Sequence, residues 1–208
     1  MMKFIGVGGQ MQNGKDTIAD HLAKMIDWER IAFAYDVKRI FCEAFDVDMA
    51  FVEKWKVIPE PPPGFKMSVR KSLQLIGDGF RSIHDDVWIN LTFKKENKTA
   101  IVSDIRYINE LKSIKERGGV TVLVWRKGKE NDDPNGSEAQ LKPMINWFVN
   151  TGLEGDVIAQ MRKMNALVNP PIGAEYVDLF IRNEGTQKEL IVKVEDVVEP
   201  YVRKYYGL

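Results

Sequence analysis

The sequence predicts a three-layer α/β protein, in which helices cover both faces of a central parallel sheet. Short apolar runs alternate along the chain with longer segments whose apolar residues recur at helical spacing. Strands separated by helices are expected to pair in parallel through right-handed crossovers. The 208 residues are enough for one hydrophobic core, so we expect a single domain over residues 1–208.

The elements follow one another in a regular order. Strands are expected at residues 3–8, 31–34, 100–103, 120–125 and 177–182. Helices are expected at 15–27, 36–45, 67–80, 88–93, 108–117, within 141–168 and at 189–205. The prolines at 59 and 61–63 predict that residues 46–66 are irregular. Gly77-Asp78-Gly79 is expected to end the helix over 67–80 abruptly, and Gly118-Gly119 the helix over 108–117.

A glycine-rich loop with a lysine, Gly9 to Thr17, joins the first strand to the first helix. Main-chain N–H groups of such a loop surround phosphates, the helix N-terminus adds partial positive charge, and Lys15 neutralises the outer phosphates. Gly9 and Gly14 are expected because a Cβ would block these backbone conformations and the approach of phosphate. The fold class is therefore that of P-loop nucleotide-binding proteins. The alternative is a glycine-rich turn with a solvated lysine.

The residue after the lysine departs from the usual pattern. Asp16 stands where Ser or Thr is usual, and the hydroxyl comes one place later, at Thr17. This offset is common in kinases of small molecules and nucleoside monophosphates. The residues expected to bind the nucleotide are Gln12, Asn13, Gly14, Lys15, Asp16 and Thr17, together with Arg126.

Bulk composition narrows the range of functions. Lys plus Arg equals Asp plus Glu, at 30 each, so no basic excess indicates a nucleic-acid partner. The single cysteine rules out an internal disulfide or a cysteine metal cluster. No apolar run approaches membrane-spanning length and the N-terminus leads directly into a strand, so we expect no membrane partner, no signal peptide and a cytoplasmic location.

Charged residues follow two further strands. Asp104 and Arg106 come after the run 100–103, and Arg126 follows 120–125. Ligands of such sheets bind at the carboxyl ends of the strands, where a carboxylate can hold Mg²⁺ or accept a proton and an arginine can bind phosphate. The alternatives are that Asp104 caps the next helix and that Arg106 forms a surface salt bridge.

Candidates for binding a second substrate lie between the second and third strands. Arg81 could hold a monophosphate, and Gln74 could read a base edge through paired hydrogen bonds. For Trp88 a place in the core is favoured over stacking on a base. The expected residues on this side are Phe33, Lys38, Arg70, Gln74, Arg81 and Trp88.

Taken in order, several blocks resemble the deoxynucleoside monophosphate kinases of tailed phages. The loop carries G-K-D-T-x-A-D from Gly14 to Asp20, and A-x-x-x-K runs from Ala34 to Lys38. The segment R-x-x-x-Q-x-x-G starts at Arg70, with Arg81 and Trp88 after it. The later blocks are D-x-R-x-x-x-E from Asp104 to Glu110, V-x-R-x-G from Val124 to Gly128, Ser137-Glu138, and residues 181–185. Asp78 and Asn135 depart from the family pattern, which leaves the base preference open.

The resemblance implies transfer of the γ-phosphoryl group of ATP to a deoxynucleoside 5′-monophosphate, for dNTP supply in phage DNA synthesis. It implies Mg²⁺ held by Thr17 and Asp104 through water, and catalytic roles for Lys15, Asp104 and Arg106. Arg106 and Glu110 join the substrate-binding residues. It further implies an acceptor-binding subdomain at about 36–93 and a lid or insertion at about 126–172, in which Arg126, Lys127 or Lys129 could close. A homodimer is plausible for kinases of this kind.

Two other functions remain open at this point. One is a different P-loop small-molecule kinase, of the phosphomevalonate or dephospho-coenzyme A type. The other is a nucleotide-dependent ATPase associated with DNA, which usually carries four apolar residues ending in Asp-Glu. In this chain Asp104 is followed by Ile105, so the Asp-Glu pair is not formed at this strand end.

Overall fold

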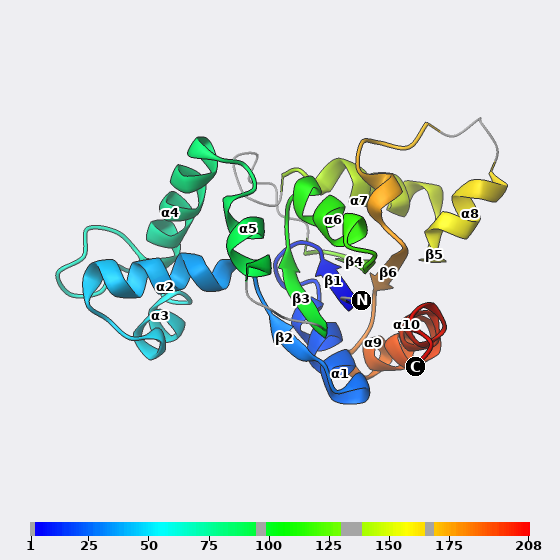
Figure 1. Cartoon of the computed structure of the whole chain (residues 1–208), viewed down its shortest axis with the longest axis horizontal. Helices are drawn as coiled ribbons and strands as arrows, with labels where there is room; N and C mark the ends of the chain where they lie inside the picture. Colours follow the sequence, from blue (N-terminus) through cyan, green and yellow to red (C-terminus); the bar gives the residue numbers. More distant parts are fainter. Residues whose placement is uncertain (1–2, 95–98, 130–138, 165–168) are drawn as a thin grey trace. The chain divides into compact units, whose positions relative to one another are not determined.

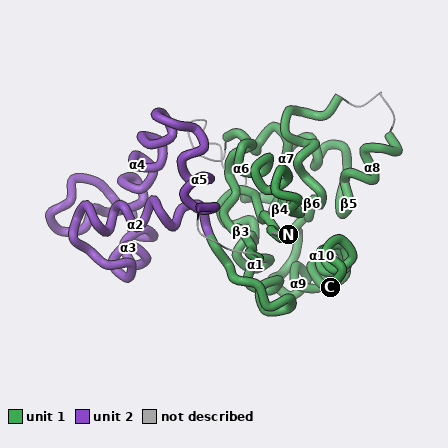
Figure 2. The backbone as a smooth tube through the Cα atoms, in the orientation of Figure 1, with its two compact units in different colours: residues 1–31, 97–208 green, residues 32–96 purple. Residues whose placement is uncertain are grey.

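A computed structural model of the chain describes residues 3–94, 99–129, 139–164 and 169–208. The chain divides into two compact units, shown in separate colours in Figure 2. We call residues 1–31 and 97–208 the sheet unit, and residues 32–96 the helical unit. The helical unit is thus an insertion in the sequence of the sheet unit.

The described part of the sheet unit contains a six-stranded sheet with the order β2-β3-β1-β4-β6-β5. All neighbouring strands are parallel except β5, which pairs with β6 in the antiparallel sense. The α/β class and the central parallel sheet predicted from sequence are therefore confirmed. The strands are β1 (Lys3–Gly8), β2 (Glu29–Ile31), β3 (Thr99–Ile105), β4 (Val120–Arg126), β5 (Gly155–Asp156) and β6 (Leu179–Asn183).

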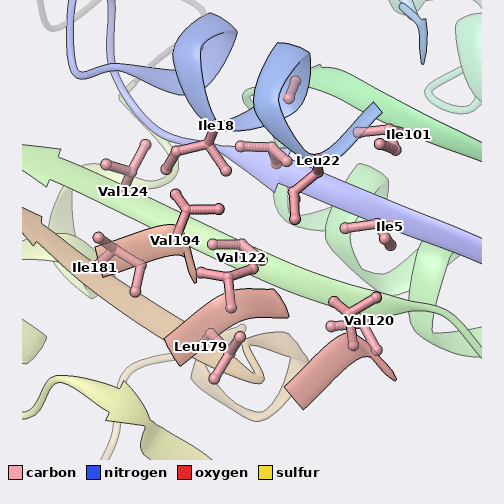
Figure 3. Close-up of a cluster of buried hydrophobic side chains, with 14 of the residues drawn as sticks. Ile5, Ile18, Leu22, Ile101, Val120, Val122, Val124, Leu179, Ile181 and Val194 are labelled. Atoms are coloured by element: carbon pink, nitrogen blue, oxygen red, sulfur yellow. The ribbon is translucent and has the colours of Figure 1, made fainter. Parts of the chain in front are cut away.

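Helices pack on both faces of this sheet (Figure 1). One face is covered by α1 (Lys15–Ile26) and by the C-terminal helices α9 (Gln187–Lys193) and α10 (Glu199–Tyr206), which a π-helical turn at Val194–Val198 joins. Branched side chains such as Ile18, Val122 and Val194 form the buried cluster between these helices and the sheet (Figure 3).

The other face carries α6 (Ile108–Glu116) and α7 (Lys142–Thr151), followed by α8 (Val157–Lys163) and a 3-10 turn at Ala174–Tyr176. Phe148 of α7 stacks on Phe180 of β6 with ring centroids 5.0 Å apart. In the part of the chain that the structure describes, none of the helices combines the length and apolar character needed to cross a membrane.

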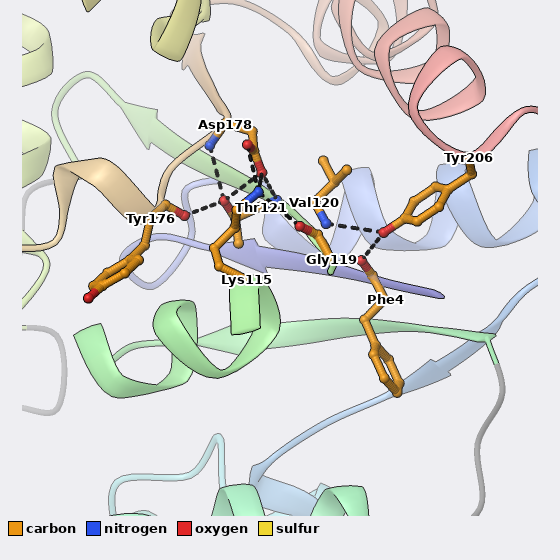
Figure 4. Close-up of polar contacts among 8 residues, drawn as sticks. All are labelled: Phe4, Lys115, Gly119, Val120, Thr121, Tyr176, Asp178 and Tyr206. Atoms are coloured by element: carbon orange, nitrogen blue, oxygen red, sulfur yellow. Dashed lines mark hydrogen bonds and ion pairs between the residues drawn. The ribbon is translucent and has the colours of Figure 1, made fainter. Parts of the chain in front are cut away.

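A network of hydrogen bonds and an ion pair lies at the end of the sheet where β4 begins (Figure 4). The buried Asp178 carboxylate accepts hydrogen bonds from Thr121 N at 2.8 Å and from Lys115 Nζ at 2.7 Å. The Tyr206 hydroxyl donates to Phe4 O at 2.5 Å and accepts from Val120 N at 3.1 Å, so it bridges β1 and β4. Each buried polar group named here has a partner, as stability requires.

The helical unit is built from α2 (Ala34–Phe45), α3 (Met49–Trp55), α4 (Val69–Ile83) and α5 (Val87–Phe93). Its buried centre contains Phe41, Val52 and Val69. Aromatic rings extend this centre, and Phe41 stacks on Phe65 with centroids 5.9 Å apart. The unit therefore has an apolar core of its own.

Three sequence predictions about this region are wrong. Residues 46–66 are not all irregular, because α3 spans Met49–Trp55 and begins at Asp48, whose side chain accepts from Phe51 N. The second strand ends at Ile31, and Ala34 already begins α2. The glycine pair does not end α4, which continues to Ile83 through both glycines.

Candidate functional site

The loop between β1 and α1 has the backbone conformation that a phosphate-binding loop requires. Gly9, Gln12 and Gly14 have φ values of 141°, 63° and 104°. Gly14 directly precedes α1, so the loop ends at the N-terminus of a twelve-residue helix. Main-chain N–H groups at such a terminus have no partner within the helix and attract anions.

The two glycines are needed for contacts that the sequence does not show. A Cβ on Gly9 would lie 2.2 Å from the carbonyl oxygen of Val124, at the end of β4. A Cβ on Gly14 would lie 2.7 Å from Leu190 Cδ2 of α9. Glycine thus allows the loop to lie close to its own sheet and helix, in addition to the positive φ values that it adopts readily.

Lys15 is held within the loop. Its side chain is buried, with 7% exposure, and Nζ donates to the carbonyl oxygen of Gln10 at 2.6 Å. The ammonium group therefore lies against the main chain of the loop that it follows. Thr17 lies in the first turn of α1 and is half-buried. A solvated lysine on an ordinary turn does not fit this burial.

Asp16 has a different environment. Its carboxylate is mostly exposed and pairs with the Arg30 guanidinium of β2, which also binds Asp20 at 2.6 Å. Burial opposes the charge on Arg30, but the hydrogen bonds and charges of these two carboxylates outweigh it and raise the Arg30 pKa. Asp16 thus links α1 to β2, and its expected contact with nucleotide stays a prediction.

A β-bulge lies beside Asp104 at the end of β3. Gly6 of β1 pairs with Val102, but Gly8 pairs with Ile105, so β3 carries one extra residue between these pairs. Ile105 packs toward α6, because a Cβ on Gly6 would lie 2.4 Å from Ile105 Cδ1 and 3.0 Å from Ile114 Cγ1. The bulge interrupts the alternation of side chains along β3 and so changes the direction of the residues at the end of this strand.

Asp104 lies at the end of β3 that adjoins the loop. Gly9 N donates to the carbonyl oxygen of Ile105 at 3.4 Å, directly beside it. The hydroxyl of Thr17 and the carboxylate of Asp104 are oxygen donors of the kind that Mg²⁺ prefers. Within the described residues, histidine, cysteine and carboxylate groups nowhere gather in threes that could hold a metal ion.

Glu110 organises the turn that follows β3. Its buried carboxylate accepts from Arg106 N at 2.7 Å and from Tyr107 N at 3.1 Å. The residue before α6 is therefore Tyr107, and the alternative in which Asp104 caps this helix is wrong. Glu110 fixes the main chain of Arg106, and any direct contact of its carboxylate with substrate stays a prediction.

Arg126 forms the last position of β4 and pairs in register with Asn183 of β6. Asn183 is not among the residues that the sequence patterns singled out for the site, yet its side chain contacts the loop directly, donating to the carbonyl oxygen of Asn13 at 3.0 Å. The signal in the sequence is an amide residue at the carboxyl end of an apolar strand. Lys127 and Lys129 are exposed after β4, and residues 130–138 and 165–168 of the expected lid or insertion lie outside the described residues.

In the helical unit, α4 arranges three of the expected side chains in one line. Arg70, Gln74, Gly77 and Arg81 are spaced by four, three and four residues, which places them on one face of a helix. Apolar residues such as Val69 and Leu73 lie on another face and join the core of the unit. We call the first four residues the polar stripe. Gly77 leaves its middle without a side chain.

The remaining candidates of this unit have structural partners. Lys38 Nζ binds Glu53 Oε1 at 2.7 Å, and Phe33 packs edge-on against Phe93 at 5.8 Å between centroids. Trp88 is 1% exposed, and its indole N–H donates to the carbonyl oxygen of Gly77 at 3.1 Å. The favoured interpretation of Trp88 as a core residue is confirmed, and a stacking role is not compatible with this burial.

The fold and the loop together define a class. A glycine-rich loop with a buried lysine joins the central strand β1 of a parallel sheet to the N-terminus of α1, with Asp104 on the neighbouring strand. This is the arrangement of P-loop nucleotide-binding proteins.

Comparison with known proteins agrees with this class. No family model matches the chain. Over 168 residues the chain is 29% identical to the "Putative deoxynucleotide monophosphate kinase" of Acanthamoeba polyphaga mimivirus, a match that covers 71% of this chain and 86% of that protein. The chain thus resembles a deoxynucleotide monophosphate kinase, as its motifs predict. An origin in a phage stays a prediction.

Solved structures of kinases are similar to the chain at lower sequence identity. Shikimate kinase from Acinetobacter baumannii in complex with shikimate has a TM-score of 0.47 and 16% identity, covering 97% of this chain and 95% of that one. Dephospho-CoA kinase from Campylobacter jejuni has a TM-score of 0.39 and 15% identity, covering 96% of this chain and 99% of that one. We draw no functional conclusion from likenesses at this level.

Proposed function

We propose that the protein transfers the γ-phosphoryl group of ATP to deoxynucleoside 5′-monophosphates, giving ADP and the diphosphates. The observation that carries this proposal is the loop from Gly9 to Thr17, which has the conformation, helix terminus and buried lysine of a triphosphate site. The nature of the acceptor is supported by the sequence resemblance to a protein named as a deoxynucleotide monophosphate kinase.

On the donor side, the main-chain N–H groups of the loop would bind the β- and γ-phosphates of ATP. Lys15 would move from the carbonyl oxygen of Gln10 to the phosphates, because a phosphate oxygen is a stronger partner for an ammonium group. Thr17 and Asp104 would hold Mg²⁺, which offsets the negative charge of the phosphates when bound.

On the acceptor side, the polar stripe of α4 would bind the monophosphate. Arg81 can bind a phosphate with two parallel hydrogen bonds, and Gln74 offers both a donor and an acceptor to the edge of a base. Gln74 and Arg81 are seven positions apart, which corresponds to a rise of about 10 Å along the helix axis. Gly77 would let the nucleotide lie close to the helix between these two side chains.

The chemistry asks mainly for charge neutralisation and alignment. A phosphate oxygen of the acceptor attacks the γ-phosphorus, and the bond to the oxygen bridging the β- and γ-phosphates breaks, leaving ADP with the electron pair. Lys15 and Arg106 would offset the charge on the transferred group, and Arg81 would hold the acceptor phosphate. Positioned cations of this kind can account for much of the rate of phosphoryl transfer.

The test is an acceptor screen with ATP and Mg²⁺, in which ADP formation is measured with dAMP, dGMP, dCMP, dTMP and dUMP. We expect ADP and the matching diphosphate with at least one of these. Phosphomevalonate, dephospho-coenzyme A and single-stranded DNA serve as comparison reactions for the alternative functions. Turnover with one of these three, and none with any deoxynucleotide, would overturn the proposal.

A further inference from the structure

Two buried carboxamides hold the middle of the phosphate-binding loop to the sheet. The Asn13 side chain, which is fully buried, donates from Nδ2 to the carbonyl oxygen of Val124 at 3.3 Å. The Asn183 side chain, which is 4% exposed, donates from Nδ2 to the main-chain carbonyl oxygen of Asn13 at 3.0 Å. The loop is thus hydrogen-bonded to the ends of both β4 and β6.

The second of these bonds controls the orientation of one peptide group. The Asn13 carbonyl belongs to the same peptide unit as the N–H of Gly14. A trans peptide is planar, and its C=O and N–H point in opposite directions. A carbonyl oxygen held toward Asn183 therefore turns the Gly14 N–H away from β6. A flip of this peptide would bring a carbonyl oxygen to where the loop now presents a donor.

Close packing makes this contact specific. A Cβ on Gly14 would lie 2.9 Å from Asn183 Nδ2 and 2.7 Å from Leu190 Cδ2. The amide of Asn183 therefore fills the space beside the left-handed Gly14, whose φ is 104°. Neither water nor a longer side chain would fit at this point without movement of the loop or of α9.

We propose that Asn183 is a positioning residue for the donor nucleotide. By binding the carbonyl oxygen of Asn13, it keeps the Gly14 N–H directed at the phosphates, although it does not touch them. The inference rests on the proposed function in requiring that the loop binds an adenine nucleotide. It assigns a role to the C-terminal strand, 170 positions from Asn13 in sequence.

The test replaces the amide with a group whose donor depends on pH. In Asn183→Asp the shape is retained, but an ionised carboxylate at this position repels the carbonyl oxygen of Asn13, whereas the protonated acid can donate to it. At pH 8 we expect ADP with Mg²⁺ to bind about 10- to 100-fold more weakly than to the wild type. Burial and the facing carbonyl oxygen should raise the pKa of this carboxyl group above its usual value of about 3.9. The ratio of the two dissociation constants, measured by calorimetry, should therefore fall as the pH is lowered to 5.5.

A second variant separates the lost donor from the added charge. Asn183→Ala leaves the carbonyl oxygen of Asn13 without its partner, so we expect a loss of affinity for ADP that does not change with pH. If Asn183→Asp does not fold, Asn183→Ala decides the question alone. Wild-type affinity in Asn183→Ala would overturn the inference.

Gln160 provides a matched control in the same unit. Its Nε2 donates to the main-chain carbonyl oxygen of Glu154 and, at 3.1 Å, to that of Asp156, both just before α8. Gln160→Glu therefore makes the same chemical change away from the loop. We expect this variant to bind ADP as the wild type does. An equal and pH-independent loss in both acidic variants would overturn the inference, because it would indicate general destabilisation. Failure of the wild type to bind ADP would instead contradict the proposed function.

Discussion

Gly77 allows the acceptor site to be tested separately from the stability of α4. Glycine inside a helix costs about 0.5–1 kcal/mol relative to alanine, because it loses more backbone freedom on folding. A Cβ built on Gly77 meets only Arg81 Nη1, at 3.5 Å, which is ordinary contact. Gly77→Ala should therefore stabilise the protein by about 0.5–1 kcal/mol, or raise its Tm by about 1–4 °C.

The same substitution should impair phosphorylation of the acceptor. The added methyl group would stand in the middle of the polar stripe, where we propose that the nucleotide approaches the helix. Crowding by one methyl group in a fitted site costs about 1–3 kcal/mol, which corresponds to a rise of about 5- to 150-fold in KM for the monophosphate. KM for ATP should remain unchanged.

Gly79 is the control for this experiment. It lies two residues further along α4, on nearly the opposite side of the helix, and nothing lies within 4 Å of a Cβ built there. Gly79→Ala should show the same gain in Tm by differential scanning calorimetry and wild-type KM for both substrates. A stabilised Gly77→Ala variant with wild-type KM for the monophosphate would refute the assignment of the stripe as the acceptor face.

Three further outcomes follow from contacts described above. Lys15→Ala should lower kcat at least about 100-fold with an unchanged circular dichroism spectrum, whereas Lys24→Ala, at an exposed position of the same helix, should be fully active. Tyr206→Phe should lower the free energy of unfolding in urea by about 1–3 kcal/mol, because it removes the hydroxyl that is hydrogen-bonded to both neighbouring strands. Glu53→Gln should destabilise the protein at pH 7 by an amount that shrinks as the solution is acidified.

The sign of the Glu53 effect follows from its pKa. Burial opposes ionisation of Glu53, but hydrogen bonds from Lys38 and Lys56 outweigh it and lower the pKa of this carboxyl group. The stabilisation is therefore complete above the pKa of the unfolded chain, about 4.3, and is lost as pH falls through the lower folded value. Urea unfolding of the wild type and of Glu53→Gln between pH 7 and 3 measures the difference between their free energies of unfolding.

Each of these outcomes can fail in a distinct way. An active Lys15→Ala variant would contradict the assignment of the loop. For Tyr206, a loss no larger than that of Tyr205→Phe, whose parent side chain is 47% exposed, would show that the bridging hydroxyl contributes nothing. For Glu53, a difference in the free energy of unfolding between the wild type and Glu53→Gln that stays constant on acidification would mean that the charge of Glu53 does not contribute to stability.

The sequence predicted those parts of the structure that depend on residues close together in the chain. The loop and its helix are encoded within Gly9 to Thr17, and the parallel sheet follows from the alternation of apolar runs with helical segments. By contrast, α3 was not predicted, because the four prolines that follow it suggested irregular structure beyond their own positions. Helix α4 continues through Gly77 because the burial of Trp88 against it outweighs the low helix propensity of glycine.

The details that complete the candidate site depend on residues far apart in sequence. The bulge beside Asp104 exists only in the pairing of β3 with β1, and no local pattern in the sequence indicates it. Asn183 contacts a loop residue 170 positions earlier, so its importance appears only once β6 is placed beside β4. Sequence patterns identified the chemical groups, whereas their orientation came from strand pairing.

The outermost strands of the sheet bear on how this protein behaves at high concentration. β2 has three residues, two of them the exposed Glu29 and Arg30, and β5 at the other border has only two residues. Long bare borders act as templates on which a second polypeptide can add itself and start aggregates. Here such templates are too short and, along β2, too highly charged to accept a foreign strand. Concentrated samples are therefore expected to resist aggregation by strand addition.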